Sequence, residues 1–415
     1  MSTCAPEPGD HSTLALFSAP RHGAVYPHKT ERLTEALTRG RLGALVATSP
    51  DNVAYLTGRS GFTEGLHDAR TFAVFTPKAT ALVVPAIDVP AVVAEAVDVD
   101  HVVCHGELAA AFPERQSAEV RRIQEIVSAT ASSPADALVA ALALTGIRGE
   151  SAVGLDESRL GPAVWQNLVG RLSGLEVVPA AEHLAEARRV KSPYEIECLD
   201  RVLRLAEEAL DVVIQALQRG MTERDAAVLY AGEIVKRGAT PLRAVVAMRD
   251  RTWIPAPRST DRALRSGDLV RFDVSATHRG YCGSVARTAV FGEPAPQAER
   301  AYLALQAGLE AASDAVRPGT SAGQIVETAA RAVRAGGLPH SACRLLGHGI
   351  GLASVERPEL ASGGVAIIEA GEVLCIEVPY YDIGSMGLAV RDTFLITSGG
   401  GRAMNRSRHD LVVLD

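Results

Sequence analysis

The stretch RFDVSATHRGYCGSVARTAVFG, residues 271–292, predicts two β-strands joined by a polar turn. Asp273 stands near the start of the first strand. Ser284 follows eleven residues later, where the second strand can point a side chain into the same space. Asp273 is therefore either half of a metal site or the remnant of one, and the rest of the sequence has to decide between the two.

Length and composition indicate a globular chain of two domains. The chain has 415 residues, of which 47% are hydrophobic and 22% are charged. This length exceeds what one ordinary hydrophobic core accommodates. A net charge of −7, without a cluster of basic and aromatic residues, argues against nucleic acid as a partner.

Neither a membrane span nor a secretory route is predicted, so we expect a cytoplasmic protein. The apolar run at 81–100 is interrupted by Asp88, Glu95 and two prolines, and the N-terminus lacks a positive region followed by an apolar stretch. The six cysteines form no CxxC pair, which predicts reduced thiols.

Two segments of different character follow a loose arm at residues 1–28. Residues 29–182 alternate strand-like and helix-like runs, the pattern of an α/β domain. The predicted strands are 42–49, 71–77, 80–86, 101–105, 152–157 and 175–180, and the predicted helices are 28–40, 90–97, 134–146 and 161–172. Residues 183–415 form the second domain, in which a helix is expected to start at Ser192-Pro193.

The second domain contains an internal repeat. Thr222 and Asp225 fit a capping box, and the helix-like stretch that they begin is repeated about a hundred residues on, with Gly220 matching Gly319. Strand-rich segments follow both copies. The repeat predicts a pseudo-symmetric α+β domain with helices packed on one curved sheet.

Several motifs in this order resemble the prolidase, aminopeptidase P and creatinase family. They are SPDNVAYLTGRSGF (49–62), ARRVKSPYEIECL (187–199), STDRALRSGDLVRFDV (259–274), GHGIGLASVERP (347–358) and CIEVPYYDIGSMGLAVRDTFLIT (375–397). The resemblance implies a small N-terminal α/β domain, a C-terminal α+β domain of the pita-bread fold, a small-molecule substrate and a homodimer.

The resemblance also implies a site for two divalent ions, held by two aspartates, a histidine and two glutamates. This chain keeps the first aspartate as Asp273, the histidine as His348 and the first glutamate as Glu377. Ser284 replaces the second aspartate, and Arg391 replaces the second glutamate. The two replaced residues are the carboxylates that bridge both ions in the family.

We therefore expect a divergent member with no metal and no other cofactor. Hard divalent cations need several anionic oxygens, which three dispersed ligands beside a guanidinium do not supply. Asp392 is a poor substitute because one step along a strand turns a side chain to the opposite face. We predict a forked pair between Arg391 and Asp273 or Glu377.

Further family histidines are missing as well. The positions implied for them hold Ala256, Val355 and Arg344, although Glu356 remains after Val355. His348 is then the remaining imidazole of the expected pocket. We predict His348, Glu377 and Glu356 as catalytic residues. The predicted substrate-binding residues are Arg344, Arg391, Asp273, Tyr381 and Trp253.

Three functions are compatible with these residues. The first is a metal-independent, creatinase-like enzyme that acts on a C–N bond of a small amidine, amide or imino-acid compound, with His348 as the proton carrier. The second is a non-catalytic member that binds a small molecule or a protein. The third is an Xaa-Pro peptidase with an atypical metal site.

Overall fold

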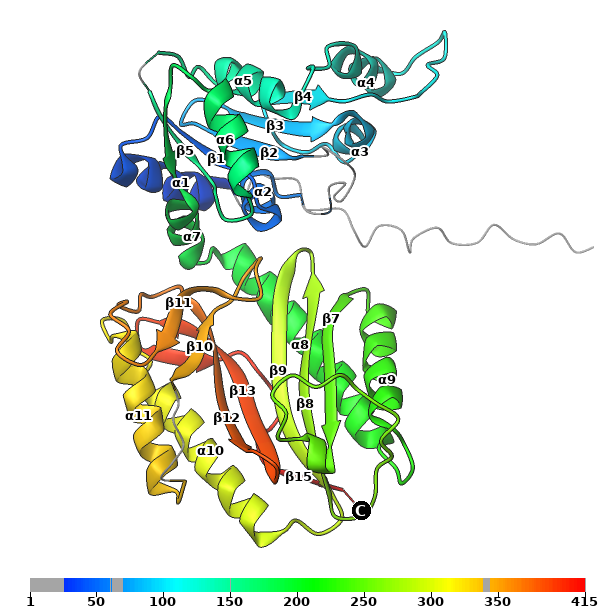
Figure 1. Cartoon of the computed structure of the whole chain (residues 1–415), viewed down its shortest axis with the longest axis vertical. Helices are drawn as coiled ribbons and strands as arrows, with labels where there is room; N and C mark the ends of the chain where they lie inside the picture. The colour runs from blue at the N-terminus through cyan, green and yellow to red at the C-terminus, as the bar shows by residue number, and fades with distance from the viewer. Residues whose placement is uncertain (1–25, 60, 62–69, 150, 339–343, 415) are drawn as a thin grey trace, which may run out of the picture.

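In the computed structural model the chain folds into two β-sheets joined by a helical segment (Figure 1). The structure describes residues 26–59, 61, 70–149, 151–338 and 344–414. An α/β domain precedes an α+β domain, as the sequence predicts. The expected arm at 1–28 falls almost entirely outside the described residues, and the first helix begins at Tyr26.

The N-terminal sheet has the strand order β4-β3-β2-β1-β5-β6. Its strands β1, β2 and β3 pair antiparallel, and the remaining neighbours pair in parallel. All six lie within the predicted ranges: β1 (Ala44–Ala47), β2 (Phe72–Phe75), β3 (Thr80–Pro85), β4 (His101–His105), β5 (Ala152–Leu155) and β6 (Glu176–Pro179). Buried apolar side chains from both faces of this sheet make two cores.

Helices cover this sheet. The described ones are α1 (Tyr26–Gly40), α2 (Pro50–Thr57), α3 (Val89–Ala94), α4 (Ala118–Ser128), α5 (Pro134–Leu144) and α6 (Pro162–Arg171), with the 3₁₀ turn η3 (Ala86–Asp88). The sequence analysis did not predict α2 and α4. Local signals mark both: α2 has a proline in its first turn and the left-handed Gly58 at its end, and Ser117 caps α4.

The two domains meet at α7 (Ala181–Arg189) and α8 (Pro193–Ala216). Ser192 and Glu195 form a capping box at the start of α8, which confirms the predicted helix start. Arg189 reaches from the end of α7 to Glu372 of the second domain, with 2.5 Å between guanidinium nitrogen and carboxylate oxygen. The junction is thus tied by charged side chains.

The C-terminal sheet has the order β11-β10-β12-β13-β9-β8-β7, with β14 paired to β13 and β15 paired to β9. Its strands are β7 (Thr240–Met248), β8 (Asp268–His278), β9 (Tyr281–Phe291), β10 (Leu345–Gly349), β11 (Glu356–Ala361), β12 (Val373–Asp382), β13 (Met386–Thr397), β14 (Gly400–Ala403) and β15 (Val412–Leu414). The 3₁₀ turn η4 (Arg249–Arg251) follows β7. The β8–β9 hairpin turns at residues 279–280, as predicted.

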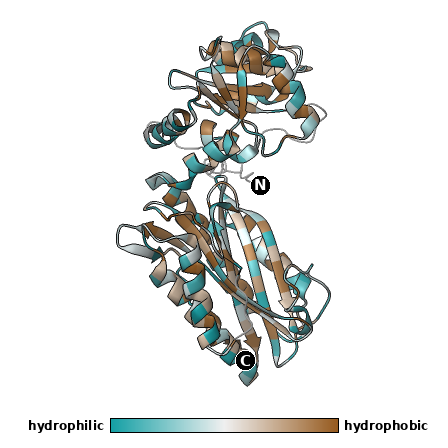
Figure 2. Cartoon of the chain, turned by 60° about the vertical axis from the view of Figure 1, so that its left-hand side comes forward, coloured by the Kyte–Doolittle hydropathy of each residue, from teal (hydrophilic) through white to brown (hydrophobic). Residues whose placement is uncertain are grey.

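Four helices pack on one face of this sheet, which we call the outer face. They are α8, α9 (Glu223–Lys236), α10 (Pro296–Ala315) and α11 (Ala322–Ala335). Phe272 of β8 lies in the core under α8 and α9, and Ile376 of β12 lies in the core under α10 and α11. Because side chains alternate along a strand, Asp273 and Glu377 point to the opposite, inner face. Figure 2 shows hydrophobic residues gathered in the strands and hydrophilic residues on the helices.

The predicted internal repeat is present. Thr222 and Asp225 form a capping box at α9, and Ser321 with Gln324 form another at α11. Gly220 and Gly319 each have a φ of 90°, a left-handed conformation that favours glycine. Each repeat therefore supplies one pair of helices to the outer face.

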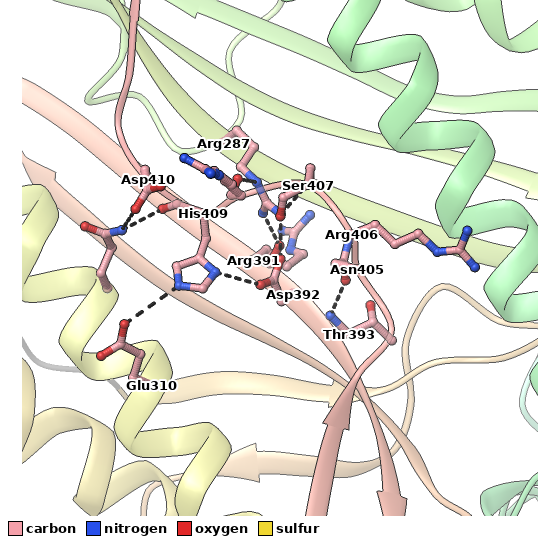
Figure 3. Close-up of polar contacts among 12 residues, drawn as sticks. Arg287, Glu310, Arg391, Asp392, Thr393, Asn405, Arg406, Ser407, His409 and Asp410 are labelled. Atoms are coloured by element: carbon pink, nitrogen blue, oxygen red, sulfur yellow. Dashed lines mark hydrogen bonds and ion pairs between the residues drawn. The ribbon is translucent and has the colours of Figure 1, made fainter.

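The C-terminal segment crosses the outer face and is held there by a buried arginine (Figure 3). Arg287, 2% exposed, lies 2.7 Å from a carboxylate oxygen of Asp392 and donates to Ser407 Oγ at 2.9 Å and to the carbonyl of Arg408 at 3.0 Å. The His409 ring lies 3.5 Å from the other Asp392 oxygen. Asp392 thus faces away from the inner face, as the strand argument predicts.

The absence of a membrane span and the reduced state of the cysteines are two further predictions. None of the helices among the described residues combines the length and the apolar character that a bilayer crossing requires. Cys104, Cys198, Cys282 and Cys375 are buried and unpaired, as predicted for reduced thiols. Cys4 and Cys343 lie outside the described residues.

Replacing Arg287 with methionine should lower the free energy of unfolding by about 3–5 kcal/mol, because it leaves the Asp392 carboxylate buried without its guanidinium. Urea denaturation measures the loss. The double substitution Arg287→Met with Asp392→Asn should recover part of it, since the Asp392 charge is then removed together with its partner. Arg402→Met, on exposed β14, is the matched control. A loss below about 1 kcal/mol for Arg287→Met would contradict this role.

Candidate functional site

One row of residues runs straight across four strands on the inner face. Asp273 of β8 pairs with Ala286 of β9, Ala286 pairs with Arg391 of β13, and Arg391 pairs with Glu377 of β12. Residues paired in this way share a face of the sheet. The small side chain of Ala286 leaves room for the Arg391 side chain to lie across it toward Asp273.

Arg391 binds both acids of the row. Its Nη1 donates to Asp273 Oδ1 at 2.7 Å and to Ser284 Oγ at 2.6 Å. On the other side its Nε donates to Glu377 Oε2 at 3.1 Å, and its Nη2 donates to the same oxygen. The expected pair is therefore present with both acids at once, and Ser284 points into the same space as Asp273.

The guanidinium at this position is charged and largely enclosed. The Arg391 side chain is 11% exposed. Burial disfavours its charged form, but Glu377 and Asp273 together outweigh burial and raise the pKa of Arg391 above its ordinary value. The two acids and the arginine are one interdependent charge cluster, which we call the Arg391 cluster (Asp273, Ser284, Glu377, Arg391).

A second arginine completes the bonding of Asp273. Arg243 of β7 lies 2.8 Å from Asp273 Oδ2, while Arg391 holds Oδ1. The sequence analysis missed Arg243. Arg243 pairs with Ser275, which is two residues along β8 from Asp273 and shares its face. A register shift in β7 hides this pairing in the sequence.

His348 lies at the end of β10, beside Cys375 of β12. Its Nδ1 is 2.9 Å from the carbonyl of Gly349, so Nδ1 must carry a proton and Nε2 is the nitrogen with a free lone pair in the neutral ring. Burial lowers the pKa of His348, and the charge of Arg391 lowers it further. Glu359, which the sequence analysis missed, is its partner across β11. His348 is a neutral imidazole at neutral pH.

Tyr381 and Trp253 lie farther along the inner face. Tyr381 is four residues from Glu377 on β12, about 13 Å along the strand and on the same face. Its ring lies 5.3 Å from the guanidinium carbon of Arg271, which donates to the carbonyl of Thr252, next to Trp253. The structure thus places Tyr381 and the turn that carries Trp253 beside the same cation, Arg271.

Gly387 allows the turn that carries Trp253 to approach. It pairs with Tyr381, and a Cβ at Gly387 would lie 2.0 Å from the carbonyl oxygen of Thr252. Any larger residue would push the turn away from β13. This glycine therefore lets the turn that carries Trp253 lie close against β13.

Glu356 lies outside the Arg391 cluster, at the domain junction. Its Oε2 accepts from Lys191 Nζ at 3.0 Å, and its Oε1 accepts from Ala353 N at 3.0 Å and lies 3.5 Å from Arg188. Burial opposes ionisation, but Lys191 and Arg188 together lower the pKa of Glu356. Both oxygens of Glu356 are engaged at the domain junction, and its catalytic role stays a prediction.

Arg344 is also set apart from the cluster. It lies exposed just before β10, and its carbonyl accepts from the backbone of Ser362. Val355 and Ala256, the other replaced histidine positions, are exposed too. Substrate binding by Arg344 remains a prediction, whereas the contacts of Arg391 with the two acids are direct.

The donor set does not fit a pair of divalent ions. Asp273 and Glu377 bond to guanidinium groups, and an arginine side chain has no lone pair to offer a metal. Within the part of the chain that the structure describes, no group of three His, Cys, Asp or Glu residues is placed to hold a metal ion. The side chains present satisfy one another's charges instead.

Comparisons with known proteins identify the scaffold. Residues 197–398 match metallopeptidase family M24, and residues 29–190 match the creatinase/prolidase N-terminal domain. The probable dipeptidase PepE of Mycobacterium tuberculosis is 30% identical over 393 residues, which is 94% of this chain and 97% of that protein. An uncharacterized peptidase of Bacillus subtilis, YqhT, is 26% identical over 268 residues, 64% of this chain and 76% of that protein.

Solved structures agree on the fold. The Xaa-Pro dipeptidase from Bacillus anthracis superposes with a TM-score of 0.78 at 19% identity, over 94% of this chain and 99% of that one. The N-terminal domain of FACT complex subunit SPT16 from chickpea superposes with a TM-score of 0.69 at 17% identity, over 94% and 99%. The pita-bread expectation is confirmed.

The imidazole of His348 should titrate below its ordinary value of about 6.5, because burial and Arg391 both disfavour its protonation. Arg391→Gln should raise this midpoint, since it removes a cation and leaves the charge of Glu377 uncompensated. Arg391→Lys keeps the cation and should keep the midpoint low. NMR of ¹³C-labelled histidine gives all three midpoints. A wild-type midpoint above 6.5, or no shift in Arg391→Gln, would contradict this electrostatic coupling.

Proposed function

The chain belongs to metallopeptidase family M24, with a creatinase/prolidase N-terminal domain, and from this we propose that it is a metal-independent enzyme on that scaffold. It acts on a C–N bond of a small amide, amidine or imino-acid compound. The observation that carries the proposal is the Arg391 guanidinium, bonded to both Asp273 and Glu377.

Electrostatics supports the absence of a metal requirement. At about 4 Å and an effective dielectric near 20, a unit charge repels another by about 4 kcal/mol, and a divalent ion by twice that. A divalent ion beside Arg391 would meet this repulsion and would also have to displace the guanidinium from Asp273 and Glu377. Arg391 and Arg243 together already balance the charges of these two acids.

His348 supplies the proton chemistry in this proposal. A neutral imidazole with a lowered pKa is a ready acceptor at neutral pH, and Nε2 is its free nitrogen. It takes a proton from the attacking group and returns it to the leaving nitrogen. Glu377 assists by orientation, because the bonds from Arg391 go to Oε2 and leave Oε1 able to accept from substrate.

Arg391 can also bind substrate. A guanidinium has five N–H groups, and four of them are directed at Asp273, Ser284 and Glu377. The remaining N–H, on Nη2, can donate to a substrate oxygen and stabilise negative charge that develops there. Tyr381 and Trp253 would then contact the apolar part of a small substrate.

The names of the relatives favour a different activity. The probable dipeptidase PepE supports the third function considered above, an Xaa-Pro peptidase with an atypical metal site. That activity would need the ions that the Arg391 cluster disfavours. Metal dependence therefore separates the two proposals.

A non-catalytic binding protein is the second candidate. It is favoured by one observation: most N–H groups of Arg391 are satisfied inside the protein, as in a structural ion pair. Binding without turnover is the result that would identify it.

Turnover of small amides, amidines such as creatine, and proline dipeptides should be measured with and without EDTA. We expect turnover of at least one small compound to survive EDTA and to fall about 100-fold or more in His348→Gln, the usual contribution of a general base. Arg402→Gln is the control for an exposed arginine. Proline-dipeptide cleavage that EDTA abolishes and manganese restores would establish the peptidase, and binding with no turnover would establish the second candidate.

The double substitution Ser284→Asp with Arg391→Glu should create manganese binding, because it places carboxylates at both lost positions beside Asp273, His348 and Glu377. Isothermal titration calorimetry should show affinity at least about tenfold above wild type. Arg391→Met with Ser284 retained is the matched control, because it removes the cation without adding oxygens. Equal manganese affinity in wild type and double variant would show that Arg391 does not exclude metal.

A further inference from the structure

We propose that a hollow lined by arginines on the outer side of the second domain binds the phosphate group of a small molecule. The hollow has a volume of about 430 Å³ and lies between the start of α8, the end of α9 and the β8–β9 turn. Its lining residues are Glu197, Cys198, Asp200, Arg201, Arg204, Arg237, Gly238, His278 and Arg279. This site is independent of the function proposed above.

Three of the four guanidinium groups there have no carboxylate partner among the described residues: Arg201, Arg204 and Arg279. The fourth, Arg237, is engaged with Glu233. The Nε of Arg204 is buried and lacks a hydrogen-bond partner within the described part of the chain. A buried donor without a partner is costly unless a ligand satisfies it.

Little negative charge opposes these arginines. Asp200 of the lining pairs with Arg406, at 3.2 Å, which leaves Glu197 as the lining acid with no ion pair among the described residues. The chain as a whole carries a net charge of −7, so general basicity does not explain this concentration of cations. The hollow is locally positive on an acidic protein.

His278, next to Arg279 in the lining, is affected by the same excess of positive charge. Nδ1 of His278 lies 3.3 Å from the carbonyl of Gly238, which favours the protonated ring. Burial lowers the pKa of His278, and Arg279 and Arg201 lower it further. Two guanidinium groups therefore act on this one ring from α8 and from the hairpin turn.

The backbone at Arg279 is unusual for an arginine. Arg279 has a φ of 53° and Gly280 a φ of 82°, so both residues of the two-residue turn are left-handed. Such a turn favours asparagine, aspartate or glycine at its first position. An arginine is held there despite that preference, and its guanidinium lines the hollow.

Phosphate is the anion that this arrangement suits. Planar guanidinium groups bind phosphate oxygens in a forked geometry, and several can share the oxygens of one phosphate. The volume leaves room for a molecule attached to the phosphate. His278 and Asp273 are five residues apart on β8, about 17 Å along the strand, so this ligand would not contact the Arg391 cluster.

Calorimetric titration of the full chain with pyrophosphate at low salt tests the proposal. We expect saturable binding of one pyrophosphate per chain, weakened about tenfold or more in Arg201→Gln with Arg204→Gln. Arg279→Asn should also weaken binding, and it suits the turn, so it separates loss of binding from loss of folding. Arg331→Gln, exposed on α11, is the control for the loss of one charge.

Two results would overturn the site: no saturable binding to wild type, or wild-type affinity in both Arg201→Gln with Arg204→Gln and Arg279→Asn. A parallel titration with citrate tests the ligand class. Weaker binding of citrate than of pyrophosphate supports phosphate recognition. Tighter binding of citrate would overturn the assignment to phosphate.

Discussion

The contact between the Arg391 guanidinium and two carboxylates governs the chemistry of the inner face. It spans the sheet from β8 to β12, because Asp273, Ala286, Arg391 and Glu377 stand in one register. A fixed cation there lies between acids that would otherwise repel each other, and it adds to burial in lowering the pKa of the nearby His348. The charge balance of the inner face thus depends largely on one side chain, and the proposed proton transfer and metal exclusion rest on it.

The same strand supports a second arginine pair on its other face. Arg391 points inward and Asp392 outward, where Arg287 joins it to the C-terminal segment. Arg287 also donates to the backbone carbonyl of Arg391, at 2.7 Å. The outer pair therefore fixes the backbone from which the inner guanidinium extends, so the packing of the C-terminal segment and the geometry of the inner face are linked.

Much of this arrangement could be predicted from the sequence, because period-two alternation assigns faces within a strand. This alternation predicted that Asp273 and Ser284 point into the same space and that Asp392 points to the opposite face. The sequence also predicted that Arg391 pairs with Asp273 or Glu377. It could not place Glu356, because Arg188 near the end of α7 and Lys191 just after that helix, which bind Glu356, are positioned by how the two domains dock. Arg243 was hidden by a register shift, and the helices α2 and α4 are much shorter than α8.

The central claim is that a cationic side chain occupies the place of the family's two ions. Metal analysis by mass spectrometry of the full chain, purified from cells grown with added manganese and cobalt, tests it most directly. We predict less than about 0.1 divalent ion per chain, because Asp273 and Glu377 are bonded to arginine. About one or two manganese, cobalt or zinc ions per chain, retained through dialysis, would contradict the account and restore peptide cleavage as the leading function.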